Sequence, residues 1–140
     1  MTSAASKKAD DARKNAGKTG EDTACERMKD AGYDILARNY AEHNIGEIDI
    51  IASDGHDIVF CEVKTRGAHP LDRPAAAVSR SKQTKICRTA LCYLQKNPTE
   101  LQPRFDVIEV FGRQAGGRFS AGRINWLKNA FGPPETLRFF

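Results

Sequence analysis

The chain has 140 residues, of which 40% are hydrophobic and 29% charged, a composition typical of one soluble globular domain. No apolar run approaches the roughly 20 residues of a membrane-spanning helix, and the N-terminus lacks the apolar segment of a secretory signal. We therefore expect a cytoplasmic protein without membrane association. The four cysteines form no CxxC pair, which favours free thiols over a zinc site or a disulfide framework.

The N-terminal segment predicts a polar tail followed by a helix. Residues 1–16 are polar and are expected to be disordered. Residues 19–32 have the pattern of a helix, with Thr19 as the N-cap and Gly32 just after the last turn. Its inward stripe consists of Ala24, Cys25 and Met28. Glu21 lies on the same stripe, so its carboxylate should point toward the sheet rather than into solvent.

Strands are expected over residues 33–40, 47–52 and 57–64. The dipeptide at 54–55 is Asp-Gly, which strongly favours a hairpin between the last two runs. A loop with two prolines follows at 66–76.

The second half predicts a long helix and a central strand. Residues 78–96 form the helix, and its inward face consists of Ile86, Cys87, Ala90, Tyr93 and Leu94, with Gln83 one turn earlier. Residues 104–112 form a strand that is apolar on both faces and should be central. The Gly-rich basic run at 112–123 is expected to be a mobile loop, and 124–131 a short strand or helix end. This order predicts an α/β fold whose mixed sheet is flanked by helices.

Alternation along the hairpin separates a charged face from an apolar one. The charged face contains Glu47, Asp49, Glu62 and Lys64, and the apolar face contains Ile48, Ile50, Ala52, Val59, Cys61 and Val63. A two-residue turn places Asp49 opposite Phe60 and Glu47 opposite Glu62. Asp49 and Glu62 are then diagonal neighbours, with Cβ atoms at most ~7–8 Å apart. A four-residue turn would keep the same faces.

Two interpretations of the charged face remain open. Asp49 and Glu62 can supply carboxylates to a Mg²⁺ ion, with Lys64 placed to stabilise charge on a phosphate. Alternatively, the face is exposed to solvent and carries cross-strand ion pairs.

The distribution of charge indicates a polyanionic partner. The net charge is +4, but the stretch from Lys64 to Arg104 contains nine Lys or Arg against two acidic residues and carries +7. A basic segment beside a carboxylate cluster suggests nucleic acid first, and a solvated helix face is the alternative.

The motifs resemble a known family. Asp49, Glu62 and Lys64, on a hairpin after a helix that carries Glu21, resemble the PD-(D/E)XK nuclease superfamily. The strings GKTGEDTA, GYDILARNY, GEIDIIA, IVFCEVKTR, SKQTKI, RFDVIEV and INWLKNAF resemble, in this order, the YraN-like family of small bacterial proteins. The resemblance covers 17–131 and leaves 132–140 as a C-terminal tail.

The resemblance implies a restriction-endonuclease-like core similar to archaeal-type Holliday junction resolvases. It implies Mg²⁺ or Mn²⁺ as the cofactor, with Asp49, Glu62 and the Val63 carbonyl as ligands. Lys64 resembles the catalytic lysine of the superfamily. Glu21 resembles the additional acid that some members carry on a helix, and its alternative is a first-turn acid favoured by the helix dipole.

The remaining polar residues are assigned less specifically. Gln83 resembles a helical glutamine of several relatives, and its alternative is a polar first turn. Arg66, Lys82 and Lys85 are expected to bind nucleic acid, whereas Asp106 beside Arg104 is expected to be structural.

The sequence thus predicts a metal-dependent DNA endonuclease, acting on branched or structured DNA, as a monomer or homodimer. One alternative is a non-catalytic nucleic-acid-binding module of the same fold. A second is a structural or protein-interaction domain. Salt-sensitive binding without cleavage would favour the binding module.

Overall fold

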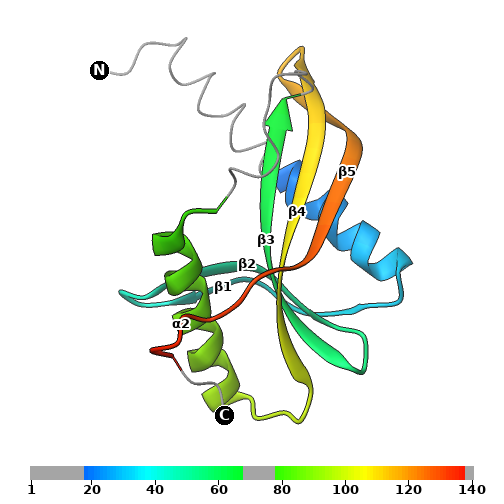
Figure 1. The fold of residues 1–140 in the computed structure, drawn as a ribbon. Coiled ribbons are helices and arrows are strands. Elements are labelled where there is room, and N and C mark those ends of the chain that lie inside the picture. Colours follow the sequence, from blue (N-terminus) through cyan, green and yellow to red (C-terminus); the bar gives the residue numbers. More distant parts are fainter. Residues whose placement is uncertain (1–17, 68–77, 138–140) are drawn as a thin grey trace.

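Five strands form one mixed sheet in the order of the chain, with a helix on each face (Figure 1). The computed structural model describes residues 18–67 and 78–137. Its elements are a helix at residues 18–30, β1 (Asp34–Glu42), β2 (Gly46–Ser53), β3 (Asp57–Gly67), α2 (Arg80–Lys96), β4 (Gln102–Ala115) and β5 (Arg118–Phe131). β3 and β4 run parallel, joined by the crossover that contains α2, and the other neighbours are antiparallel.

This arrangement confirms the predicted α/β class and the mixed sheet of a restriction-endonuclease-like core. β4 is an interior strand with β3 and β5 on its two sides, as its two apolar faces indicated, but the middle strand of the sheet is β3. The tail predicted at 1–16 lies outside the described residues. The predicted tail at 132–140 is described only as far as 137, and that part contains no helix or strand.

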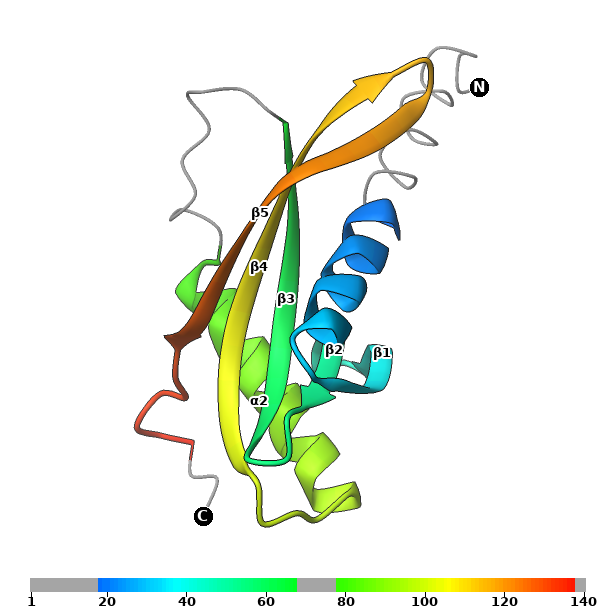
Figure 2. The same cartoon turned by 90° about the vertical axis from the view of Figure 1, so that its right-hand side faces the viewer.

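The two helices lie on opposite faces of the sheet (Figure 2), and a hydrophobic cluster lies beneath each of them. Ala24, Cys25 and Met28 of the first helix pack on one face, so the predicted inward stripe is confirmed. The second cluster lies under α2 and contains the predicted residues Ile86, Cys87 and Ala90, with Phe60 and Phe105 from the sheet. Burial of these side chains on both faces supplies the main driving force for folding.

The apolar face predicted for the hairpin is wrong at one position. Ile50 belongs to the first cluster, whereas Ile48 belongs to the second. The β2–β3 pairing ends at Ile50 with Cys61, and beyond this pair β2 turns away from β3 toward α2 (Figure 1). Simple alternation therefore fails where the two strands separate.

The register of the β2–β3 hairpin also differs from the prediction. Ser53 pairs with Ile58, so the turn has four residues rather than two. The Asp54 carboxylate explains the longer turn, because its Oδ1 accepts hydrogen bonds from the amides of His56 and Asp57 at 2.9 and 2.7 Å. Phe60 consequently pairs with Ile51 instead of Asp49.

The Gly-rich run at 112–123 is not a loop but the end of a long β4–β5 hairpin. Gly116 and Gly117 make the turn with positive φ values of 59° and 76°, which glycine adopts without strain. Gly112 leaves room for the ring of Phe119, which is buried in the first cluster. Packing of this one aromatic side chain anchors a segment whose composition suggested mobility.

A buried polar network supports the middle of β4. Both carboxylate oxygens of Asp106 accept hydrogen bonds, from the Arg104 guanidinium, the Trp126 indole and the Asn129 amide, all at 2.8–2.9 Å. Arg104 also donates to Asp57 and Tyr33. The structural role predicted for Asp106 is thus confirmed.

Candidate active site

Asp49 lies where the β2–β3 pairing ends, just beyond the last pair between the two strands. Its Oδ2 accepts a hydrogen bond from the Val63 amide at 2.8 Å, so a carboxylate replaces the next rung of the ladder. In the observed register Asp49 comes level with Glu62 rather than Phe60. Burial, and then repulsion from the Glu62 carboxylate, raise the pKa of Asp49 to about 7. The carboxylates of Asp49 and Glu62 therefore lie close together in a partly buried environment.

Glu62 is only 4% exposed, and two ammonium groups flank it. Lys82 Nζ lies 2.5 Å and Lys64 Nζ 3.6 Å from Glu62 Oε1. Burial, and then repulsion from Lys82, lower the pKa of Lys64. Burial lowers the pKa of Lys82, but the hydrogen bond of its ammonium group to Glu62 outweighs this effect, so the pKa of Lys82 is raised. Glu62 is thus buried, unlike the exposed face of the alternative interpretation, whereas Glu47 of the same predicted face is exposed.

Glu21 reaches the same region from the first helix. Gly20 allows the helix to approach β3 closely, because a Cβ there would overlap the Thr65 side chain. Burial raises the pKa of Glu21, and repulsion from Glu47 contributes in the same direction. Arg38 holds Glu21 only loosely at 3.8 Å, since its short bond of 2.7 Å goes to Asp22. The predicted inward direction of Glu21 agrees with this partial burial.

Glu109 was missed by the sequence reasoning. It is fully buried on β4, level with Lys64 of β3, and its Oε1 accepts a hydrogen bond from Asn125 at 3.0 Å. Its Oε2 lies 3.7 Å from Arg66 Nε, and among the described side chains neither atom has a hydrogen-bond partner. A glutamate inside the apolar run RFDVIEV was the available signal.

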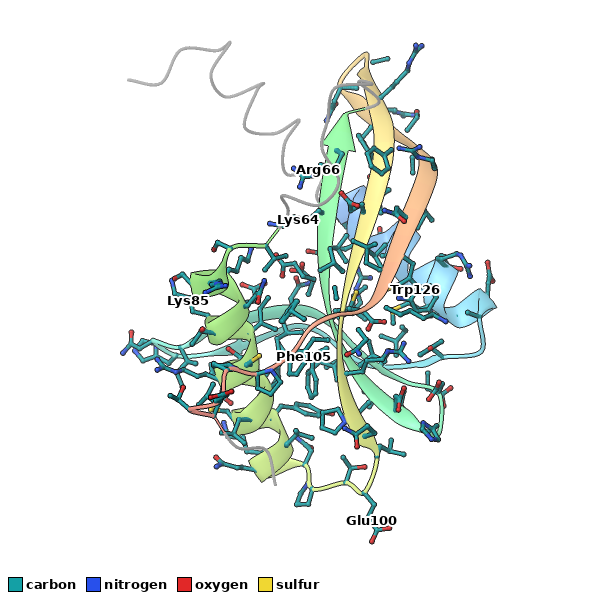
Figure 3. The ribbon with its side chains drawn as sticks, viewed as in Figure 1. Lys64, Arg66, Lys85, Glu100, Phe105 and Trp126 are labelled. Atoms are coloured by element: carbon teal, nitrogen blue, oxygen red, sulfur yellow. The ribbon has the colours of Figure 1, made fainter. Side chains whose placement is uncertain are left out.

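Two other predicted residues, Gln83 and Lys85, lie on α2. The Gln83 side chain donates to the Val78 carbonyl at 3.2 Å, so its amide serves the start of α2. Lys85 is exposed on α2, away from Lys64 and Arg66 on β3 (Figure 3). The region around the two β3 residues thus gathers carboxylates and basic groups from β2, β3, β4 and α2.

The donor set suits a hard divalent cation. Asp49 and Glu62 offer carboxylate oxygens, and the predicted third ligand is the Val63 carbonyl. Mg²⁺ typically takes one or two carboxylates and completes its shell with water and phosphate oxygens. No group of three or more acidic, His or Cys side chains in the described chain is arranged to hold a metal. The raised pKa of Asp49 is the condition that a bound cation would relieve.

The mixed five-stranded sheet with a helix on each face is consistent with the restriction-endonuclease-like core of a nuclease-like α/β domain. The model of the Uncharacterised protein family UPF0102 matches residues 20–110, and the chain belongs to this family. This confirms the YraN-like resemblance.

Curated relatives cover nearly the same length. A UPF0102 protein of Clostridium botulinum is 42% identical over 120 residues, which span 84% of this chain and 94% of the relative. A UPF0102 protein of Acetivibrio thermocellus is 40% identical over 117 residues, or 83% and 90% of the two chains. In the described residues, no helix has the length and apolar character needed to cross a membrane.

Proposed function

We propose that this protein is a Mg²⁺- or Mn²⁺-dependent endonuclease that hydrolyses phosphodiester bonds in DNA. The observation that carries the proposal is the pair of a half-buried Asp49 and a buried Glu62, with the Lys64 ammonium beside it. Strongly perturbed pKa values cluster at functional sites, and burial with the nearby Glu62 raises the pKa of Asp49 to about 7. A cation and a phosphate group together would balance these charges.

The residues take distinct roles in this proposal. Asp49, Glu62 and the Val63 carbonyl hold the cation, which would stabilise charge on a phosphoryl oxygen and activate water. Lys64 donates hydrogen bonds to the oxygens on which charge develops. A water oxygen bonds to phosphorus, the bond to the leaving sugar oxygen breaks, and that oxygen takes up a proton.

Lys82 and Arg66 bind the neighbouring phosphates. Lys82 is exposed at the start of α2 and is the basic group nearest Glu62, so it can transfer its hydrogen bond from the carboxylate to a phosphate. Arg66 contacts Glu109 through Nε, which leaves its terminal nitrogens for a bidentate contact.

A second candidate function is a non-catalytic nucleic-acid-binding module. The 2.5 Å ion pair of Lys82 with Glu62 favours it, because this ammonium already neutralises one of the two carboxylates. In that case Lys82 would hold the centre closed, and the basic groups alone would contact the phosphates.

The test is cleavage of labelled duplex, single-stranded, flapped and four-way-junction DNA in Mg²⁺ and in Mn²⁺. Asp49→Ala should abolish cleavage, and Glu47→Ala, which removes an exposed acid two residues away, is the matched control. Equal cleavage by wild type and Asp49→Ala would indicate a contaminant. Metal-independent binding by wild type without cleavage would favour the binding module.

A further inference from the structure

The β4–β5 hairpin ends in a two-stranded ribbon, residues 111–124, that extends beyond both helices (Figures 1 and 2). It carries Arg113, Arg118 and Arg123, all exposed. The chain contains no acidic residue between 110 and 134, so no carboxylate of the ribbon offsets these charges. The described contacts give Arg123 one aromatic partner, Phe111, with the guanidinium 4.3 Å from the ring centroid.

Strand register places the arginines on one face of the ribbon. Arg113 pairs with Ser120, and Arg118 pairs with Ala115, so the two arginines project from the same face. Gln114 and Phe119 form the pair between them and project from the other face, where Phe119 joins the cluster under the first helix. The arginine face is therefore the opposite face, on which α2 packs.

That face also carries the candidate active site. Along β4, Glu109, Phe111 and Arg113 alternate onto one face, and the first two pair with Lys64 and Arg66 of β3. Lys64, Arg66, Arg113 and Arg118 thus form a continuous basic row that begins at the carboxylate pair. At about 3.3 Å per strand residue, Arg113 lies about 13 Å and Arg118 about 20 Å along the row from Lys64.

The ribbon is also slender, because its remaining residues are mainly small. Gly112, Ala115, Gly116, Gly117, Ser120, Ala121 and Gly122 leave little side-chain bulk around the arginines. A two-stranded ribbon fits the major groove of B-form DNA, and arginine binds phosphate oxygens in a bidentate manner.

We propose that this ribbon is a DNA-binding arm that holds duplex DNA to one side of the active site. The proposal rests on the proposed function for its partner. DNA rises 3.4 Å per base pair, so the arm contacts phosphates about four to six base pairs from the position at Lys64. The contacts are to the backbone, so the arm contributes affinity with little dependence on sequence.

Binding of labelled duplex DNA, measured in EDTA to prevent cleavage, tests the arm separately from the chemistry. Arg113→Gln/Arg118→Gln should weaken binding by about tenfold or more and reduce the slope of log affinity against log salt by about 2. Lys29→Gln/Arg88→Gln removes the same charge from exposed positions on the two helices and is the matched control. Melting temperatures should be alike, because all four side chains are exposed.

If the arm variant and the control variant bind DNA with equal affinities and equal salt slopes, the proposal that the ribbon binds DNA is refuted. It is also refuted if the wild-type protein binds no duplex DNA at low salt. If cleavage depends on Asp49 but the arm variant binds DNA as well as the control variant, the DNA-binding arm is refuted and the nuclease proposal is not. Loss of binding in the arm variant, without cleavage by wild type, would support the arm and refute the nuclease proposal. When fewer than about four base pairs of duplex remain on one side of the active site, DNA binding by the wild-type protein should weaken, whereas binding by the arm variant should not change.

Discussion

Two groups of buried carboxylates in the same sheet differ in how their charges are balanced. Asp106 has hydrogen-bond donors on both oxygens and the Arg104 guanidinium beside it. Asp49 and Glu62 instead repel each other, although Asp49 accepts a hydrogen bond from the Val63 amide and Glu62 has two ammonium groups beside it. Burial and this repulsion raise the pKa of Asp49 to about 7. A carboxylate with donors on both oxygens is compatible with a purely structural role, whereas two carboxylates that repel each other destabilise the fold unless a cation compensates.

Two carboxylates on one strand show the same difference. Asp106 and Glu109 are both fully buried on β4, three residues apart. Glu109 leaves Oε2 without a hydrogen-bond partner within the described structure and lies level with Lys64. The two buried carboxylates therefore differ in the completeness of their hydrogen bonds and not in their burial.

The largest expected effect is loss of stability on Asp106→Asn. The amide cannot balance Arg104 and presents an NH₂ group to donors, so we expect the free energy of unfolding to fall by about 3–5 kcal/mol. Urea unfolding of this variant beside Glu26→Gln, an exposed carboxylate on the first helix, measures the difference. A loss below about 1 kcal/mol would mean that the network is not a stabilising one.

The next effect is a pH dependence that belongs to Asp49. Folding raises its pKa from 3.8 to about 7, so the unfolded chain holds this proton less tightly. The stability of the metal-free protein should therefore fall as pH rises from about 4 to 7, by an amount on the order of 2–4 kcal/mol. Unfolding in EDTA at pH 5 and pH 8 should show this loss in wild type and not in Asp49→Asn. Identical pH dependence in the two proteins would contradict the assignment.

A smaller effect is stabilisation by Mg²⁺ at pH 8. A cation that binds only the folded state at 100 times its dissociation constant adds about 2.7 kcal/mol. The increase should appear in wild type and in Glu26→Gln but not in Glu62→Gln, as measured by thermal unfolding. An equal response in all three would indicate binding elsewhere.

The smallest expected effect is that of Glu109→Gln, the same chemical change as Asp106→Asn on the same strand. The amide oxygen can still accept from Asn125, and the lost charge had no hydrogen bond at Oε2. We expect the free energy of unfolding to change by less than about 1 kcal/mol. A loss of unfolding free energy as large as that of Asp106→Asn would mean that the two carboxylates do not differ in the way that their hydrogen bonds indicate.

Local pattern was sufficient to predict much of the site, and long-range pairing was not. Alternation and the hairpin signal brought Asp49, Glu62 and Lys64 together, and helical periodicity turned Glu21 inward. The turn length failed because it depends on how the Asp54 side chain bonds the following amides. Turns of two and of four residues leave the same side chains on the same face of the hairpin. The wrong turn length therefore did not affect the prediction that Asp49, Glu62 and Lys64 share a face.

Glu109 and the arm required knowledge of strand order. The parallel pairing of β3 with β4 places Glu109 beside Lys64, and neither alternation nor propensity specifies which strands become neighbours. The glycines at 116 and 117 indicated a turn as readily as a mobile loop. Burial of Phe119 in the first hydrophobic cluster, whose other members are distant in sequence, distinguishes the two.

Crystals soaked in Mn²⁺, with anomalous scattering recorded at the manganese edge, test the central claim most directly. We predict an anomalous peak between the carboxylates of Asp49 and Glu62, with the Lys82 ammonium displaced from Glu62. Absence of a peak there, with Lys82 still bound to Glu62 at saturating Mn²⁺, would contradict it.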